Sequence, residues 1–249
     1  MRLAVPAAFL AGVAVAVLPA WLVQRNQEPP LRGAEVERIV ADYLREHPDA
    51  IIEAIRSYQA RAEQAQRQGM QDMVRARWDE ISRQPDDPVL GNPEGDVTLV
   101  EFFDYRCGYC KRAFPDVLAL RKHDPQLRIV LKEFPILGPE SVIAAQASLA
   151  SRQQGRYAEF HEALMQVQGQ LDEARIMSVA EQVGLDLDRL RRDMDSPEVE
   201  AVLQRNFALA EELGIRGTPA FLTRNRVIPG AVGAETLKSM IAEARQKPS

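Results

Sequence analysis

The sequence predicts an α/β protein whose sheet is interrupted by a helical insertion and preceded by a separate helical segment. Two strand-like runs, residues 97–103 and 127–134, flank a helical pattern. A block of helices then fills residues 139–213, and a hairpin at 220–228 and a helix at 234–245 end the pattern. This order of strand, helix, strand, helices, hairpin and helix is typical of one sheet that carries a helical insertion.

The first residues form an apolar segment of the kind that directs export. Arg2 precedes residues 3–23, a run of 21 residues without a charge. A positively charged start before an apolar run is typical of a secretory signal, and about 20 apolar residues are also enough to span a bilayer. We therefore expect residues 1–25 to be either a cleaved signal peptide or an uncleaved signal-anchor, with the rest of the chain exported.

Residues 34–84 are expected to be helical. Apolar side chains recur there at steps of three and four, first before the break at His47-Pro48 and then from Ile51 to Ile81. The segment is too small to bury this stripe in a core of its own. It must pack on a second copy of itself, which we prefer, or on its own domain. We expect the α/β domain to occupy residues 85–249.

Each element of that domain has its own local signal. Residues 89–95 indicate a short strand and turn, and residues 97–103 are β-branched and aromatic, as in a buried strand. The helix over 108–123 contains Pro115, a possible kink. Breaks in the helical block fall at turn residues, which are Gly155, Gly169, Gly184 and Pro197.

The two cysteines of the chain stand together, as Cys107-Gly108-Tyr109-Cys110, between a predicted strand and a predicted helix. That spacing and context are typical of thiol–disulfide exchange. Unpaired N–H groups and the helix dipole lower the pKa of a thiol at a helix start. We therefore expect Cys107 to attack and the more covered Cys110 to resolve. Gly108 and Tyr109 would tune the stability of the thiolate and hence the redox poise.

Other uses of the two cysteines are less well supported. A bridge between residues this close removes little chain entropy, so a purely structural disulfide is weak. A closed zinc site needs four ligands, and the scattered His47, His123 and His161 are expected to be solvated or capping residues. Two thiolates can bind Cu(I), which stays an alternative function. No cofactor beyond the redox disulfide is expected, and the net charge of -5 disfavours nucleic acid as a partner.

Further site residues are expected on either side of the cysteine pair. Glu101 lies six residues before Cys107, and strand alternation can place it beneath the two thiols as a buried carboxylate with a raised pKa. Such a group can take the proton from Cys110 when that thiol attacks. Lys132, on the neighbouring predicted strand, is a candidate partner for Glu101. A solvated Glu101 at the edge of the strand is the alternative, and Asp104 and Arg106 are expected at the surface.

Gly217-Thr218-Pro219 lies just before a predicted strand. A proline there cannot donate a ladder hydrogen bond, so it has another use. The sequence alone favours a trans Thr218–Pro219 bond, since cis is the rarer form. A cis bond, the alternative in a tight turn, would leave backbone groups beside the turn free to pair with an extended substrate strand.

Together these residues resemble the DsbA superfamily of exported thiol–disulfide oxidoreductases. The resemblance covers about residues 85–247 and is carried by Glu101–Cys110, Lys132–Pro135 and Gly217–Pro219. It implies a thioredoxin fold, a periplasmic location, a cis-proline loop facing the dithiol, and a proton-relay pair matched by Glu101 and Lys132. Residues 36–59 are similar to the oligomerisation segment of ScsC-like suppressor-of-copper-sensitivity proteins.

The resemblance also implies what the protein does. The ScsC-like subgroup contains oligomers with disulfide isomerase or reductase activity, and Gly-Tyr between the cysteines resembles isomerases more than the Pro-His pair of the strong monomeric oxidase. We therefore expect a homo-oligomeric isomerase or reductase that acts on client proteins with disulfides and is kept reduced by a membrane redox partner. A DsbA-like thiol oxidase is the alternative.

Overall fold

A computed structural model describes residues 33–246 and divides the chain between Ala60 and Arg61 into two compact units. The expected signal or anchor segment, residues 1–25, lies outside the described residues. Within residues 33–246, no helix combines the length and the apolar character needed to cross a membrane.

The first unit is helical. It contains α1 (Gly33–Glu46) and the beginning of α2 (Pro48–Ala76), which are separated at His47. Pro48 opens α2, where its missing N–H costs no helical hydrogen bond. No residue of α1 is buried. Eight large apolar side chains in the described part of this unit are instead exposed, namely Val36, Ile39, Val40, Tyr43, Ile51, Ile52, Ile55 and Tyr58.

The second unit begins within α2, earlier than the boundary at residue 85 that we expect from the sequence. One continuous helix to about Gln84 is also expected, but the structure ends α2 at Ala76 and starts a short α3 (Trp78–Ser82). Val74 of α2 and Ile81 of α3 are fully buried. The end of the long helix therefore contributes to the core of the second unit, which is why the unit starts before residue 85.

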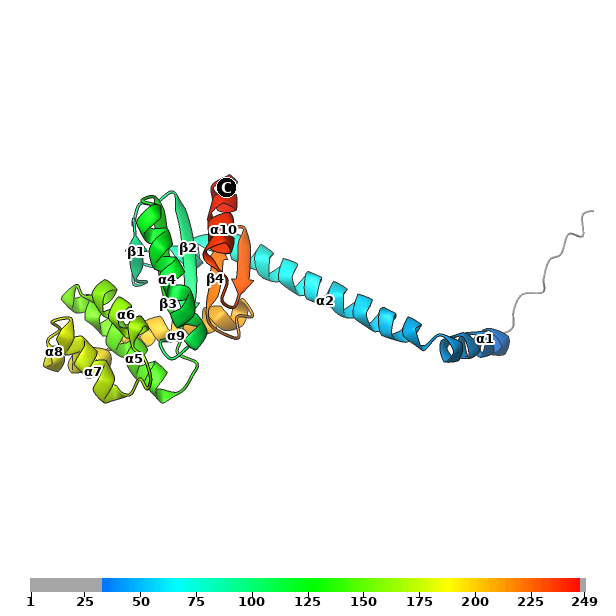
Figure 1. Cartoon of the computed structure of the whole chain (residues 1–249), viewed down its shortest axis with the longest axis horizontal. Coiled ribbons are helices and arrows are strands. Elements are labelled where there is room, and N and C mark those ends of the chain that lie inside the picture. Colours follow the sequence, from blue (N-terminus) through cyan, green and yellow to red (C-terminus); the bar gives the residue numbers. More distant parts are fainter. Residues whose placement is uncertain (1–32, 247–249) are drawn as a thin grey trace, which may run out of the picture. The chain divides into compact units, whose positions relative to one another are not determined.

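A five-stranded sheet forms the centre of the second unit (Figure 1). Its strands lie in the order β1-β3-β2-β4-β5, with β2 parallel to β3 and the other neighbours antiparallel. Their bounds are β1 Val89–Gly91, β2 Val97–Phe103, β3 Leu127–Glu133, β4 Ala220–Thr223 and β5 Arg226–Pro229.

The two central strands, β2 and β3, are buried on both faces. On one face, Leu99 and Phe103 belong to a core that includes residues of α4 (Gly108–His123), α10 (Ala234–Gln246) and the helical insertion. On the other face, Val100 and Phe102 pack with Val74, Ile81 and the end of α9 (Pro197–Glu212). Consecutive side chains of β2 therefore enter different cores.

Helices between β3 and β4 make the insertion, which is labelled in Figure 1. They are α5 (Pro139–Ser151), α6 (Tyr157–Gln166), α7 (Glu173–Gln182), α8 (Leu187–Met194) and α9, with a short 3₁₀ turn at Arg152–Gln154. Asp172, Asp186 and Ser196 each accept a backbone N–H as N-caps of α7, α8 and α9. The predicted α/β class with a helical insertion and a preceding helical segment is confirmed.

Candidate active site

Cys107 is the N-cap of α4, directly after β2 and a short turn. Its Sγ accepts a hydrogen bond from the backbone N–H of Cys110 at 3.2 Å. Its thiol also lies 3.3 Å from the carbonyl oxygen of Thr218, to which it can donate. Neither cysteine is in a disulfide, and Cys107 is only 4% exposed while Cys110 is fully buried. The structure therefore brings both thiols and the proline loop to one point, as the sequence predicts.

The surroundings of the two thiols move their pKa values apart. A hydrogen bond from the Cys110 thiol, helped by Thr218 and by the N–H groups of Cys110 and Tyr109, lowers the pKa of Cys107 to about 6 against the opposing effect of burial. Burial, followed by the hydrogen bond to Cys107 and the charge of Glu101, raises the pKa of Cys110 well above its usual value. At neutral pH the first thiol is therefore a thiolate and the second is not.

The loop that faces Cys107 enters β4 through a cis Thr218–Pro219 peptide bond. The carbonyl oxygen of Pro219 accepts a hydrogen bond from the N–H of Gly230, at 2.8 Å. This contact fastens the loop to the end of β5, while Arg216 and Gly217 beside it are exposed. Backbone on the outer side of the loop is thus accessible next to the attacking sulfur.

Glu101 is the buried carboxylate expected beneath the dithiol, since it is 2% exposed and its Oε1 has no hydrogen-bond partner among the described residues. Burial, with a smaller contribution from the charge of Cys107, raises the pKa of Glu101 to about 8. The charge of Glu101 in turn raises the pKa of Cys110. The alternative of a solvated carboxylate is therefore wrong.

Lys132 is not the partner of Glu101. In the parallel pairing of β2 and β3, Glu101 lies opposite Leu131, and Lys132 lies opposite Phe102. Side chains of paired residues point to the same face, and neighbours along a strand alternate. Lys132 therefore points to the face away from Glu101, where its Nζ forms a fully buried ion pair with Asp87. The expected relay pair is corrected to a lone Glu101.

Asp104 is a second correction, because it is 1% exposed rather than at the surface. Its Oδ1 accepts hydrogen bonds from the N–H of Arg106 and the hydroxyl of Ser141, at 2.7 and 2.8 Å. Its Oδ2 accepts the N–H groups of Ile136 and Leu137, at 2.8 and 3.0 Å. Asp104 thereby fixes the turn before Cys107 to the loop after β3. Of the two residues expected at the surface, only Arg106 is partly exposed, and it forms an ion pair with Glu140 at 2.7 Å.

A buried polar cluster lies on the insertion side of the sheet and was not predicted from the sequence. The hydroxyls of Tyr105 and Tyr157 donate to Glu133 Oε1 at 3.1 and 2.8 Å. Tyr105 Oη also lies 2.6 Å from Ser148 Oγ and 2.9 Å from His161 Nδ1. Burial raises the pKa of Glu133 to about 8 and lowers the pKa of His161 to about 3. His161 is thus a neutral core residue, which corrects the expectation of a solvated or capping one.

The dipeptide between the cysteines faces outward. Tyr109 is 61% exposed, and the guanidinium of Arg112 lies 4.2 Å from the centre of its ring. This cation–π contact holds the exposed ring against the side chain of Arg112. Among residues 33–246, no three His, Cys, Asp or Glu side chains gather as metal ligands.

A helix-capping dithiol opposite a cis-proline loop, on a mixed sheet with a helical insertion, defines a thioredoxin-type redox site. Residues 98–242 match the DSBA-like thioredoxin domain family, and residues 34–65 match the copper resistance protein ScsC N-terminal domain. The chain belongs to the DsbA-like thioredoxin domain family, and its fold is the expected thioredoxin fold.

Solved structures resemble the chain closely. A thioredoxin-like oxidoreductase from Silicibacter pomeroyi DSS-3 is 48% identical, with a TM-score of 0.67, over 68% of this chain and 98% of that one. Proteus mirabilis ScsC in a transitional conformation is 28% identical, with a TM-score of 0.65, over 86% of this chain and 97% of that one.

Curated relatives include a Na(+)/H(+) antiporter NhaA of Herminiimonas arsenicoxydans, which is 32% identical over 161 residues. That match covers 64% of this chain and 26% of the antiporter. The chain therefore spans about a quarter of the length of the first curated relatives that it matches.

Proposed function

We propose that this protein is an exported thiol–disulfide oxidoreductase that reduces or rearranges disulfides in client proteins. The observation that carries the proposal is the position of Cys107 at the N-cap of α4, where its Sγ accepts the N–H of Cys110 at 3.2 Å and lies 3.3 Å from the carbonyl oxygen of Thr218. In this position the pKa of Cys107 is lowered to about 6, whereas that of Cys110 is raised. One thiol is ready to attack at neutral pH while the other keeps its proton in reserve. Membership of the DsbA-like thioredoxin domain family supports the same class of reaction.

The first step is exchange at Cys107. Its thiolate attacks one sulfur of a client disulfide, a Cys107–client bond forms, and the other client sulfur leaves as a thiolate. The product carries no charge on Cys107. Because that charge helps to raise the pKa of both Glu101 and Cys110, its loss makes both groups easier to ionise.

The mixed disulfide then has two fates. The freed client thiolate can attack a different client disulfide and liberate another client thiolate. That thiolate then attacks the client sulfur of the mixed disulfide, so a rearranged client disulfide forms and Cys107 leaves as a thiolate. Alternatively, Glu101, which can ionise once the charge of Cys107 is gone, accepts the proton of Cys110. The Cys110 thiolate then attacks the Cys107 sulfur and releases the client reduced. In the second case a Cys107–Cys110 disulfide forms, and a membrane redox partner must supply two electrons to restore the dithiol.

We further propose that the protein works as a homo-oligomer in the periplasm. The exposed apolar side chains on α1 and early α2 support self-association, because isolated amphipathic helices need a partner to cover such a face. The match of residues 34–65 to the ScsC N-terminal domain supports the same role for this segment. Residues 1–25 are proposed to direct export, as a cleaved signal or as an anchor.

A Cu(I)-binding role is the second candidate, because residues 34–65 match the N-terminal domain of the copper resistance protein ScsC. Cys107 and Cys110 offer two soft sulfur ligands. Binding at both sulfurs requires two thiolates, and the raised pKa of Cys110 opposes the second one. Titration of the reduced protein with Cu(I) against a chromogenic chelator tests this role. Tight binding that is lost in Cys107→Ser, without any disulfide exchange, would favour it.

Refolding of scrambled ribonuclease is the decisive experiment for the leading proposal. We expect the reduced full-length protein to restore ribonuclease activity from the scrambled form, and Cys107→Ser to abolish this. The parallel assay starts from reduced ribonuclease and the oxidised protein. Rapid oxidation there, with no gain from scrambled substrate, would instead assign the protein as a thiol oxidase.

A further inference from the structure

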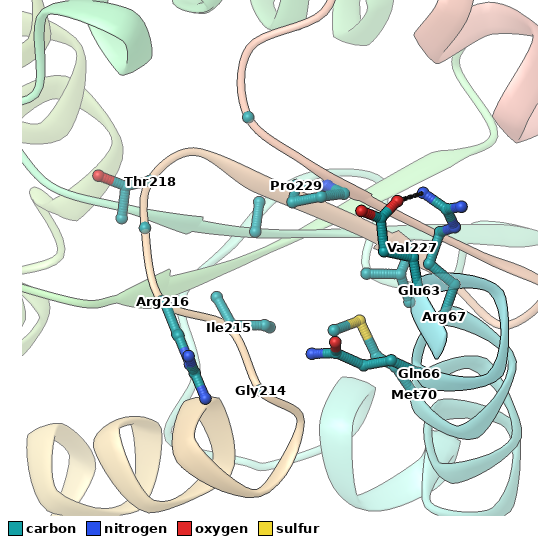
Figure 2. Close-up of a pocket in the computed structure, with 13 residues that line it drawn as sticks. Glu63, Gln66, Arg67, Met70, Gly214, Ile215, Arg216, Thr218, Val227 and Pro229 are labelled. Carbon is teal, nitrogen blue, oxygen red and sulfur yellow. Dashed lines mark ion pairs between the residues drawn. The ribbon is translucent and has the colours of Figure 1, made fainter. Parts of the chain in front are cut away.

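A cavity of about 400 Å³ lies within the second unit, between α2 and the loop that leads to β4. In Figure 2, Met70 of α2 lies on one side of the pocket and Thr218 on the opposite side, with Ile215 between them. Its lining includes Gln66, Met70, Ile215, Thr218, Val227 and Pro229. The volume is within the range of about 300–1,000 Å³ that is usual for binding pockets.

This pocket shares Thr218 with the redox site. Thr218 belongs to its wall, and the carbonyl oxygen of the same residue is 3.3 Å from Cys107 Sγ. A client whose cysteine reaches Cys107 must pass along the loop at Thr218. Side chains of that client close to its cysteine therefore come within reach of the pocket.

The inner surface of the pocket is apolar, while its rim is charged. Ile215 and Val227 supply aliphatic side chains. Met70 lies close to Gly214, since a Cβ added to that glycine would be 3.6 Å from the Cε of Met70. At the rim, Arg67 pairs with Glu63 at 3.8 Å, and both side chains are largely exposed. An apolar interior with a charged rim fits an apolar side chain whose own backbone remains at the solvent edge.

We propose that the second half of α2 is part of the client-binding surface, with Met70 forming the wall that selects an apolar client side chain near the reacting cysteine. The inference rests on the proposed function and adds a specificity determinant outside the residues 98–242 that match the family. Glu63, Gln66, Arg67 and Met70 share one helical face, since they follow steps of three and four. A methionine wall is flexible and polarisable, so it adapts to apolar side chains of different shape.

Competition between thiols for Cys107 tests the inference. The full-length Cys110→Ala protein, which cannot resolve a mixed disulfide, is first treated with oxidised glutathione, so that a Cys107–glutathione disulfide forms and one glutathione leaves as a thiolate. It is then equilibrated with reduced glutathione and a single-cysteine peptide. The peptide thiolate attacks the Cys107–glutathione disulfide, a Cys107–peptide disulfide forms, and glutathione leaves as a thiolate. Intact-mass spectrometry measures the two adducts. Peptides carry Leu or Ser at one of the positions flanking their cysteine.

We expect Leu to be preferred over Ser by about tenfold at one of these positions, as burial of a leucine side chain requires. Met70→Trp, which fills the pocket, should reduce that preference to less than about twofold. Met70→Ala, which enlarges the pocket, should move the preference from Leu to Phe. Met73→Trp is the matched control, because Met73 is on the same helix, is 38% exposed and does not line the pocket; it should keep the preference for Leu.

Two results would overturn the inference. One is the absence of any position at which Leu and Ser differ. The other is a Leu preference that survives both Met70 substitutions unchanged. Adducts of Cys107 with glutathione and with the peptides would still form in both cases, so the exchange function would stand. Failure to form any adduct at Cys107 would instead reject the proposed function itself.

Discussion

Glu101 and Lys132 lie on opposite faces of the sheet, although their strands are paired with each other. The carboxylate is on the face of Leu99 and Phe103, beneath the dithiol, whereas the ammonium is on the face of Phe102 and binds Asp87. The charge of Cys107 contributes to the raised pKa of Glu101, whereas Asp87 and not Glu101 supports the charged form of Lys132. The proton transfer that we propose at Cys110 would therefore rely on a carboxylate that has no buried counter-ion among the described residues.

Replacing Glu101 by Gln should stabilise the reduced protein, and increasingly so as the pH rises. A carboxyl whose folded pKa is about 8, above its unfolded value of 4.5, keeps a proton that the unfolded state releases. Its cost to stability is absent below the unfolded pKa, grows between the two values and is complete above the folded pKa. We expect Glu101→Gln to raise the free energy of unfolding by roughly 2–4 kcal/mol at pH 8 and by less than about 1 kcal/mol at pH 5.

Urea denaturation of both proteins at the two pH values measures this difference. Glu133 has a similarly raised pKa, but it is present in both proteins and cancels in the comparison. A pH-independent difference would contradict a protonated, buried Glu101.

Replacing Lys132 by Met should destabilise the fold and leave the thiol chemistry intact. The substitution strands Asp87, which is fully buried and keeps only the longer contact of 3.4 Å to Arg205. Removing one member of a buried ion pair costs about 3–5 kcal/mol, which thermal or urea unfolding will detect. The double variant Lys132→Met with Asp87→Leu should recover most of that loss. A shift in the pKa of Cys107 in either variant would show that Lys132 acts on the dithiol after all.

The low pKa of Cys107 should depend on the donor at position 110. Cys110→Ala removes the thiol that donates to the Cys107 sulfur, which is the main cause of the lowered pKa. We expect the pKa of Cys107 to rise by about one to two units, as the loss of one hydrogen bond to a charged group implies. Cys110→Ser keeps a hydrogen-bond donor at position 110, so the pKa of Cys107 should rise less in that variant. The pH dependence of iodoacetamide alkylation measures both, and equal values for the two variants would refute this cause.

Asp104 should be needed to hold the turn before Cys107. Four donors now share the two carboxylate oxygens of Asp104. Asp104→Asn keeps the shape of the side chain, but its amide group offers only one acceptor oxygen to those donors. An unsatisfied buried donor costs about 1–3 kcal/mol, so the free energy of unfolding should fall by that amount. Arg106→Ala, which breaks the exposed contacts of the guanidinium with Glu140 and with the carbonyl oxygen of Leu137, serves as the control and should cost less than about 1 kcal/mol. Equal losses would contradict the central role of Asp104.

The exposed apolar face of the first unit should control the state of assembly. Ile39→Asp and Ile55→Asp each place a charge among the apolar side chains that we propose to pack between copies. We expect either substitution to shift the protein to monomers in analytical ultracentrifugation, because burying an unpaired carboxylate is costly. Glu53→Gln, which is on α2 like Ile55, is the control and should leave the assembly unchanged. A wild-type protein that is already monomeric at micromolar concentration would end this proposal.

Local sequence patterns predicted most of the fold and the centre of the site. Strand residues 97–103 and the helix from Gly108 to His123 agree with the structure, because their signals are short-range. The geometry at Cys107 follows directly from their junction.

Interactions across the fold account for what the sequence did not reveal. The side to which Lys132 points depends on the register between two strands, which a single sequence does not encode locally. Buried polar residues such as Asp104 and His161 look like surface residues until their partners, distant in the chain, are known. Val74 likewise joins the core only through contact with strands that follow it, which moved the start of the second unit.

The 4% exposure of Cys107 also bears on how quickly its sulfur is irreversibly oxidised. Conversion of a thiolate to sulfinic and sulfonic acids depends on how freely peroxide reaches it. Here the sulfur is screened by the N-terminal turn of its own helix on one side and by Thr218 on the other. A freely diffusing oxidant therefore meets very little of the surface of this sulfur.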